Sequence, residues 1–207
     1  LQYAAGFGKS NIIGWTALQL KDMRDENHNF VYDKIMIVVD RLQLRDQLDT
    51  TLRNMNIQKG MFVEATNGRT FKTALKSDKR IVIVNIQKFG AADSESAFLD
   101  KEALKKLANM RVVFLIDEIH RTNSGDLHDD MLSVFDELQS AFDNSEEYTT
   151  SRTKKNLIIG FTATPSDNTL ARFGEFAQYQ ESEIKWVPFD SYSMREAIQD
   201  GVILDPT

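Results

Sequence analysis

Four short runs of apolar residues divide this chain of 207 residues and constrain its fold more than any other feature: 35–39, 81–86, 112–116 and 157–161. An uninterrupted apolar, β-branched run is typical of a strand that is covered on both faces. Helical patterns lie between the runs, such as the stripe of Leu44, Leu48 and Leu52. Buried strands that alternate with helices predict one α/β unit with a mainly parallel sheet, helices on both faces and right-handed crossovers.

Weaker patterns complete the predicted elements. Residues 61–64 and 186–189 are predicted strands, the second at a sheet edge because Pro188 donates no main-chain hydrogen bond. The segment 12–23 is apolar on nearly all sides, which predicts a helix buried between other elements. Ser193 and Glu196 form a capping box that opens a helix to about residue 200. Further helices are predicted at 41–55, 69–76, 99–110, 127–142 and 169–173.

A glycine-rich cluster opens the first of these helices: residues 6–10 read Gly-Phe-Gly-Lys-Ser. Glycines let the main chain curl so that successive N–H groups face an anion, and the helix adds its positive end. The pattern predicts a phosphate-binding loop in which Lys9 reaches the β- and γ-phosphates and the Ser10 hydroxyl ligates Mg²⁺. The alternative is a glycine-rich turn that caps an ordinary helix. Tyr3 stands where the usual pattern has a small residue, and there it would crowd the loop or stack near the nucleotide.

Two adjacent carboxylates, Asp117 and Glu118, end the most apolar run. Ligands of open α/β sheets bind at the carboxyl ends of the strands, and buried carboxylates are costly unless they meet a cation or do chemistry. The pair therefore predicts that Asp117 holds Mg²⁺ through its water shell and that Glu118 orients and deprotonates an attacking water. The alternative, a pair of solvated turn acids, is weakened by the glycine-rich cluster upstream.

Composition narrows the class of protein. The net charge of −6 argues against a protein that holds nucleic acid by bulk positive charge. A local basic track is still compatible, because salt screens charges beyond about 8–10 Å. The chain has no cysteine, which excludes disulfides and thiolate metal sites. No apolar run approaches the ~20 residues of a membrane span, and we expect a cytoplasmic protein without a membrane partner.

Five short motifs follow one another along the chain. They are Gly6-Phe7-Gly8-Lys9-Ser10, Val39-Asp40-Arg41, Ile86-Gln87-Lys88-Phe89, Asp117-Glu118-Ile119-His120 and Thr162-Ala163-Thr164-Pro165. Their order resembles the first motor lobe of superfamily-two helicases and translocases. Within that group, the residues of these motifs are similar to those of the R subunit of type I restriction-modification enzymes, and so is the segment Tyr-Ser-Met-Arg-Glu-Ala-Ile at 192–198. The resemblance covers nearly the whole chain and implies one RecA-like lobe over residues 1–207.

The resemblance implies a role for each motif. The ATP site would be formed by Gly6, Phe7, Gly8, Lys9, Ser10 and Asn11. The catalytic residues would be Lys9, Asp117 and Glu118, with Mg²⁺ held by Ser10 and Asp117. The residues that couple nucleotide state to DNA would be His120, Thr162 and Thr164. The residues on the DNA track would be Arg41, Gln87 and Lys88.

Several of these residues also have a purely structural interpretation when each is considered alone. Arg41 could be a solvated residue at a helix start, and His120 a structural histidine. The threonines of 162–165 could serve turn chemistry before a proline. The sequence also departs from the resemblance at Asn85, where relatives often carry a hydroxyl residue, as it does at Tyr3.

The implied function is ATP hydrolysis coupled to translocation of double-stranded DNA, which feeds a nuclease. We expect the chain to be a piece of a longer protein, truncated at the phosphate-loop strand, with about 190–207 leading toward a second motor lobe. The implied partners are double-stranded DNA, that second lobe and a nuclease domain of the same chain, and methyltransferase and specificity subunits. Without the arginines of the second lobe, the 207 residues alone should hydrolyse ATP poorly. The alternatives are another superfamily-two helicase or remodelling ATPase, and a nucleotide-dependent binding module that does not hydrolyse.

Overall fold

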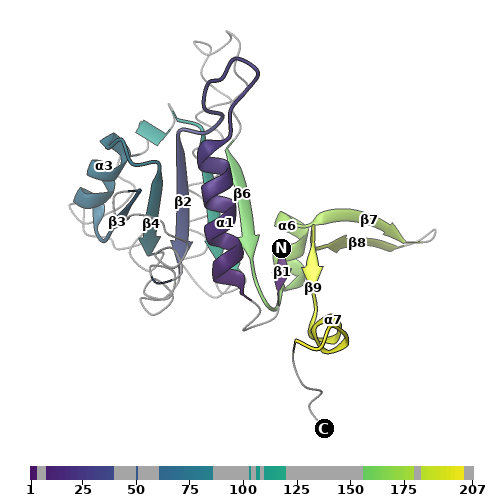
Figure 1. The fold of residues 1–207 in the computed structure, drawn as a ribbon. Coiled ribbons are helices and arrows are strands. Elements are labelled where there is room, and N and C mark those ends of the chain that lie inside the picture. The colour runs from purple at the N-terminus through teal and green to yellow at the C-terminus, as the bar shows by residue number, and fades with distance from the viewer. Residues whose placement is uncertain are drawn as a thin grey trace.

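The computed structural model describes residues 1–3, 8–39, 50, 61–85, 103, 106–107, 110–119, 156–179 and 183–202. Its centre is a five-stranded sheet in the order β3-β4-β2-β5-β6, with every neighbouring pair parallel (Figure 1). The strands are β2 (Lys34–Val39), β3 (Phe62–Ala65), β4 (Ile81–Asn85), β5 (Val112–Asp117) and β6 (Leu157–Phe161). Each of the four apolar runs therefore forms a strand, and the predicted parallel sheet is confirmed.

Alternate residues of these strands pack into separate cores on the two faces of the sheet. On one face, Met36 and Val38 join Phe71 of α3 (Gly68–Lys76), with Ala103 and Leu107 in the same cluster. On the other face the core contains Ile35, Ile37, Val39, and Ile13 and Ala17 of α1 (Lys9–Asp22). β2 and β5 are buried along their whole length, which explains why their sequences do not alternate. Helices on both faces of a parallel sheet confirm the predicted RecA-like α/β fold.

The first helix is less enclosed than the sequence predicts. α1 buries Ile13, Gly14 and Ala17, whereas Trp15 is 56% exposed. The prediction of a helix buried between other elements is therefore wrong. The reason is that α1 lies as an outer layer across one face of the sheet, so that only one side of the helix meets the strands (Figure 1).

A second parallel pair continues the sheet beyond β6. β1 (Gln2–Tyr3) pairs with β9 (Ser191–Tyr192), and Gln2 forms an isolated parallel bridge with Thr162. The Leu1 nitrogen donates to the Gly160 carbonyl at 2.8 Å, and the Tyr3 amide donates to the Thr162 carbonyl at 2.8 Å. β1 therefore lies between β6 and β9, and the strand that precedes the glycine-rich cluster is held beside β6.

The C-terminal part contains a hairpin that the sequence did not predict. α6 (Asp167–Phe173) is followed by β7 (Glu175–Tyr179) and β8 (Glu183–Val187), an antiparallel pair that projects from the sheet (Figure 1). The strand predicted at 186–189 overlaps β8 only at residues 186 and 187, and its partner β7 was missed. Phe176 and Trp186 pack edge to face across the hairpin, with ring centroids 5.7 Å apart.

The last helix, α7 (Met194–Gln199), begins as predicted. The Ser193 hydroxyl accepts from the Glu196 amide, and the Ser193 amide donates to the Glu196 carboxylate at 2.6 Å. The predicted helices at 41–55 and 127–142 lie outside the described residues, apart from Thr50, which is helical. Within the described ranges, no helix is long and apolar enough to cross a membrane.

Candidate functional site

α1 begins at the carboxyl edge of the sheet, where the glycine-rich cluster ends. Gly8 is its N-cap with φ 73°, in the left-handed region that glycine adopts without steric cost. The Gly8 carbonyl accepts from the amides of Asn11 at 2.8 Å and Ile12 at 3.1 Å. No side-chain hydrogen bond caps this end of the helix. The first amides of α1, those of Lys9 and Ser10, therefore lie at the positive end of the helix dipole. Such a helix end suits an anion.

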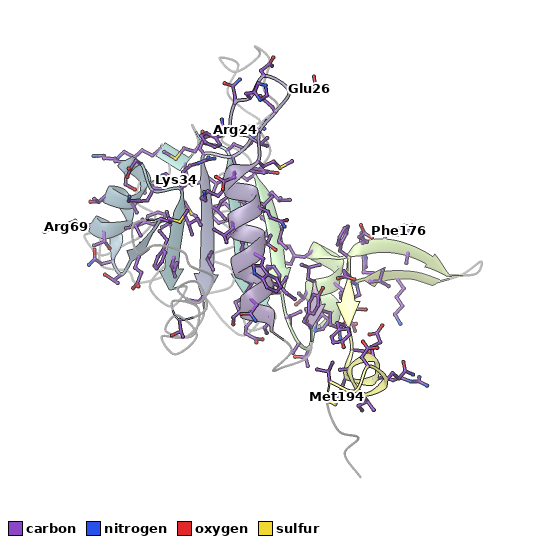
Figure 2. All side chains as sticks on the ribbon, viewed as in Figure 1. Arg24, Glu26, Lys34, Arg69, Phe176 and Met194 are labelled. Carbon is purple, nitrogen blue, oxygen red and sulfur yellow. The ribbon has the colours of Figure 1, made fainter. Side chains whose placement is uncertain are left out.

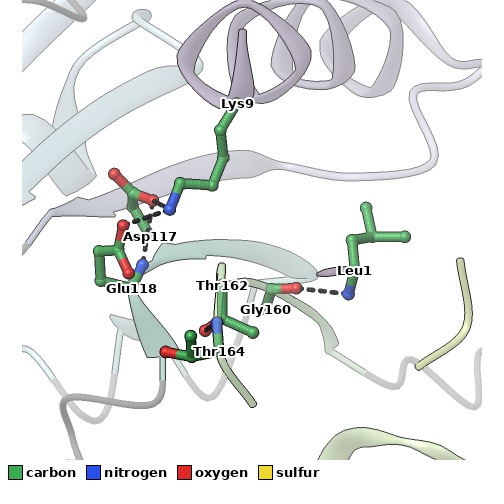
Figure 3. A network of polar contacts seen from close by, with 7 residues as sticks. All are labelled: Leu1, Lys9, Asp117, Glu118, Gly160, Thr162 and Thr164. Carbon is green, nitrogen blue, oxygen red and sulfur yellow. Dashed lines mark hydrogen bonds and ion pairs between the residues drawn. The ribbon is translucent and has the colours of Figure 1, made fainter. Parts of the chain in front are cut away.

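Lys9 joins this helix to the end of β5 (Figure 3). Its ammonium lies 3.5 Å from Asp117 Oδ1 and forms a closer ion pair with Glu118 Oε1. The side chains of Lys9, Asp117 and Glu118 are only 10, 4 and 17% exposed, so solvent screens these charges weakly. Although 109 positions separate Lys9 from Glu118, the fold brings together the three residues that the sequence indicated as catalytic.

The charges of this cluster are unequal. Burial raises the pKa of Asp117, the Lys9 ammonium acts in the opposite direction, and the Glu118 carboxylate raises it again. Asp117 Oδ1 also accepts a hydrogen bond from the Glu118 amide at 3.0 Å. Among the described residues of this cluster, two carboxylates face one ammonium, an excess of negative charge at a buried edge. This excess fits a divalent cation.

The number of ligands also fits magnesium. Among the described residues, no group of three or more His, Cys, Asp or Glu side chains could hold a metal ion. Mg²⁺ needs no such protein cage, because it is usually bound by one or two carboxylates together with waters and substrate phosphates. Asp117 on one side and the Ser10 hydroxyl in the first turn of α1 match that mode.

Glu118 has an unusual main chain. Its φ is 51°, and His28 is the only other non-glycine residue with positive φ in the described part of the chain. A left-handed main chain is unfavourable for a residue with a Cβ atom and persists only where the surroundings impose it. The carboxylate is therefore presented from a constrained turn between β5 and Ile119.

Thr162 and Thr164 lie at the same edge of the sheet (Figure 3). Asp117 is opposite Phe161 in the β5–β6 pairing, so Thr162 follows one residue beyond the level of Asp117. The Thr162 hydroxyl accepts from the Thr164 amide at 3.1 Å. The turn chemistry that the sequence offered as an alternative is thus present, and it holds both threonines beside the two carboxylates.

Tyr3 is held by the C-terminal segment. Its hydroxyl donates to Asp190 Oδ2 at 2.6 Å, and its ring lies 6.5 Å from that of Tyr192. This hydrogen bond is the main reason that the pKa of Tyr3 is raised to about 12. Nothing in the sequence pattern pointed to Asp190 as a partner of Tyr3.

The remaining predicted site residues are described only in part. Ser10 and Asn11 lie in the first turn of α1, and Asn11 is exposed. Asn85 ends β4. The predicted residues that lie outside the described part of the chain are Gly6, Phe7, Arg41, Gln87, Lys88 and His120. Their roles stay predictions.

Comparison with known proteins agrees with the fold. The model of the SWI2/SNF2 ATPase family matches residues 3–206. A type I restriction enzyme endonuclease subunit of Staphylococcus saprophyticus is 28% identical over 208 residues, covering 98% of this chain and 18% of the relative. The subunits of two Staphylococcus aureus strains are 26% identical over 211 residues, with the same coverage.

The chain thus spans 18% of the length of the curated relatives that it matches. These matches confirm the predicted resemblance to the R subunit of type I restriction enzymes. The family model extends over almost the whole chain, and Lys9 of α1 meets Asp117 and Glu118 at the carboxyl edge of the parallel sheet. This chain therefore belongs to the SWI2/SNF2 ATPase family.

Proposed function

We propose that the chain is the ATP-binding motor lobe of a DNA-translocating restriction endonuclease subunit. In the full-length protein, ATP hydrolysis at this lobe drives translocation of double-stranded DNA and leads to its cleavage by a nuclease domain. The observation that carries the proposal is the contact of the Lys9 ammonium with both Asp117 and Glu118, at the carboxyl edge of a parallel sheet and at the start of α1. The family match and the names of the relatives support it.

Each residue of the cluster has a distinct task in this proposal. The main chain of residues 6–11 binds the phosphates, and Lys9 places a positive charge beside them. Ser10 and Asp117 hold Mg²⁺. Glu118 orients a water molecule and takes its proton. Bound ATP with Mg²⁺ supplies the reactive γ-phosphoryl group and a metal charge that stabilises the transferred phosphate.

Coupling and DNA contact involve the neighbouring motifs. Thr162 and Thr164, together with His120, relay the state of the nucleotide to the DNA. The DNA track is formed by Arg41, Gln87 and Lys88, which follow β2 and β4 along the chain. We propose that residues 1–207 form a single motor lobe and that 190–207 leads toward a second lobe. That lobe supplies arginines, so the isolated chain hydrolyses ATP slowly.

Two other functions remain as competing hypotheses. A remodelling ATPase or helicase of the same superfamily would share this lobe but have no nuclease domain, and sequence on either side of these residues decides between them. A binding module without hydrolysis would retain Lys9 but need no Glu118. The contact of Glu118 with Lys9 favours hydrolysis.

The decisive experiment is Glu118→Gln in the full-length protein. The amide keeps the shape of the side chain but cannot accept the proton, so turnover should fall by about 10²–10⁴. ATP affinity should persist, because Lys9, Ser10 and Asp117 are unchanged. Glu175→Gln, at the exposed start of β7, is the matched control and should leave turnover unchanged. Near-normal turnover of Glu118→Gln would refute the role of Glu118, and absence of DNA-stimulated hydrolysis in the unmodified protein would favour the binding module.

A further inference from the structure

Ile119, the residue after Glu118, packs directly on Gly160 of β6. Ile119 is only 2% exposed, and Gly160 is also buried, opposite Ile116 in the β5–β6 pairing. A Cβ atom at position 160 would lie 2.6 Å from Ile119 Cδ1, 3.0 Å from Cγ2 and 3.3 Å from Cβ. The first distance is far too short for carbon atoms, which prefer ~3.5–4.0 Å, and the other two are tight contacts. Ile119 therefore occupies the space that any side chain at position 160 would need.

Ile119 also fixes one end of the strained turn that carries Glu118. The left-handed φ of 51° at Glu118 has to be imposed by its neighbours. On one side, Asp117 is buried in β5 and its Oδ1 accepts from the Glu118 amide at 3.0 Å. On the other side, the side chain of Ile119 is anchored in the core cluster that includes Val84, Phe114 and Ile116. How closely Ile119 approaches β6 thus determines the main-chain geometry at Glu118.

We propose that the contact between Ile119 and Gly160 positions the Glu118 carboxylate for its reaction with water. Ile119 is a positioning residue in this inference, which rests on the proposed function. The lack of a side chain at Gly160 lets Ile119 sit against β6 and so sets the turn at Glu118. The same strand continues to Thr162, whose hydroxyl binds the Thr164 amide. The contact therefore also joins the Glu118 turn to the strand that carries the threonines.

Gly160→Ala in the full-length protein tests this inference. The added methyl group has to displace Ile119, and through it the neighbouring Glu118. A misplacement of about 1 Å can cost a factor of about 10² in rate, so kcat should fall by about 10- to 100-fold. ATP affinity should change little, because Gly8 and Lys9 belong to α1, on the other side of the site. Because partial unfolding would also lower the apparent kcat without changing the affinity, kcat is expressed per ATP-binding site, counted by titration.

Gly174→Ala is the control for general destabilisation. Its Cβ atom would lie 2.6 Å from the Leu170 carbonyl oxygen and 2.7 Å from that of Val187. The same change of Gly to Ala thus causes an equally short contact where α6 meets β7, but with main-chain oxygens rather than with the side chain of Ile119. It should lower thermal stability but leave the kcat of the folded protein unchanged.

Rescue by a smaller residue at position 119 is the most specific readout. Ile119→Val removes Cδ1, the closest atom, and Ile119→Ala removes Cγ2 as well. In the Gly160→Ala background, Ile119→Val should restore part of kcat and Ile119→Ala more of it. With Gly160 intact, Ile119→Ala alone should lower kcat about tenfold, because the turn then loses its anchor. Two harmful single substitutions whose combination is nearly normal identify a direct steric coupling.

Each outcome decides a different question. A normal kcat of folded Gly160→Ala, or a loss that neither Ile119 substitution reverses, would overturn the inference. If Gly160→Ala does not fold, Ile119→Ala alone decides, and an unchanged kcat would overturn the inference equally. Glu118→Gln is measured in parallel. Near-normal turnover of Glu118→Gln would refute the proposed function. If turnover of Glu118→Gln collapses while Gly160→Ala has a normal kcat, only the positioning role of Ile119 is refuted.

Discussion

Lys34 lies at the start of β2 with its ammonium inside the protein, and its replacement by Met tests how α3 is anchored (Figure 2). The residue is only 5% exposed. Its Nζ donates to the carbonyls of Ala74 at 3.1 Å, Ser77 at 2.7 Å and Lys79 at 2.5 Å. These carbonyls belong to the end of α3 and to the turn that leads to β4. One side chain therefore holds a helix terminus and the following turn against the central strand.

The expected loss of stability follows from these three acceptors. In Lys34→Met all three carbonyls lose the ammonium, but the Ala74 carbonyl keeps the Ser77 hydroxyl at 2.8 Å and the Ser77 amide at 3.2 Å. The loss therefore falls on the carbonyls of Ser77 and Lys79. Leaving a carbonyl without its hydrogen-bond donor costs about 1–3 kcal/mol, so two such carbonyls lower the free energy of unfolding by about 2–6 kcal/mol before any compensation. Met no longer has to bury a charge, and this relief offsets part of the loss. We expect a net loss of about 2–3 kcal/mol.

Hydrogen exchange of the full-length protein, read in peptides that cover 66–85, measures this loss locally. A change of about 2–3 kcal/mol accelerates the slowest amides of α3 by about 30- to 150-fold. Lys79→Met is the control, because the Lys79 ammonium pairs only at 3.8 Å with the exposed Asp78, a contact worth about 0–1 kcal/mol. Equal protection of α3 in Lys34→Met and in the control would refute the anchoring role.

The pH dependence of the same protection gives a second, independent check. Burial lowers the pKa of Lys34 from its ordinary value of 10.5. At pH values between the lowered pKa of Lys34 in the folded chain and 10.5, Lys34 is more protonated in the unfolded chain than in the folded chain. The free energy of unfolding that this group contributes therefore rises with pH across that interval. The protection of wild-type α3, compared with that of Lys34→Met, should therefore increase as the pH approaches 10.5.

Three further predictions concern the nucleotide site, the DNA track and the β1–β9 pair. Lys9→Ala removes the point charge beside the phosphates, so a titration should show weaker ATP binding as well as slower turnover, and unchanged affinity would exclude Lys9 as the phosphate lysine. Arg41→Ala or Lys88→Ala should weaken DNA binding equally for all sequences and flatten its salt dependence, and a sequence-selective loss would contradict this placement. Tyr3→Phe should remove a phenol with a pKa of about 12 from the ultraviolet titration. Because the hydrogen bond to Asp190 raises this pKa above the unfolded value of 10.0, its contribution to stability is present below pH 10 and is lost toward pH 12.

The sequence by itself determined the strands of the central sheet and located two carboxylates at the end of one of them. A strand covered on both faces needs an apolar residue at nearly every position, so β2 and β5 were readable from their own residues. The capping box of Ser193 and Glu196 lies within four consecutive residues and was equally local. Asp117 and Glu118 were recognised because two carboxylates directly follow a buried strand. In each case the signal and the structure that it specifies lie in the same short segment.

The tertiary structure alone decided which distant residues meet. The strand order β3-β4-β2-β5-β6 and the hairpin of β7 and β8 depend on pairing between segments that carry no mark of their partners. The same holds for Tyr3 and Asp190, which are 187 positions apart. Lys34 looks like a solvated residue at the start of a strand, and only the fold shows the three carbonyls around its ammonium. Trp15 is exposed because a helix in an outer layer meets the sheet on one side only. Sequence periodicity indicates how much of a segment is buried, whereas the fold of the whole chain decides which segments become its neighbours.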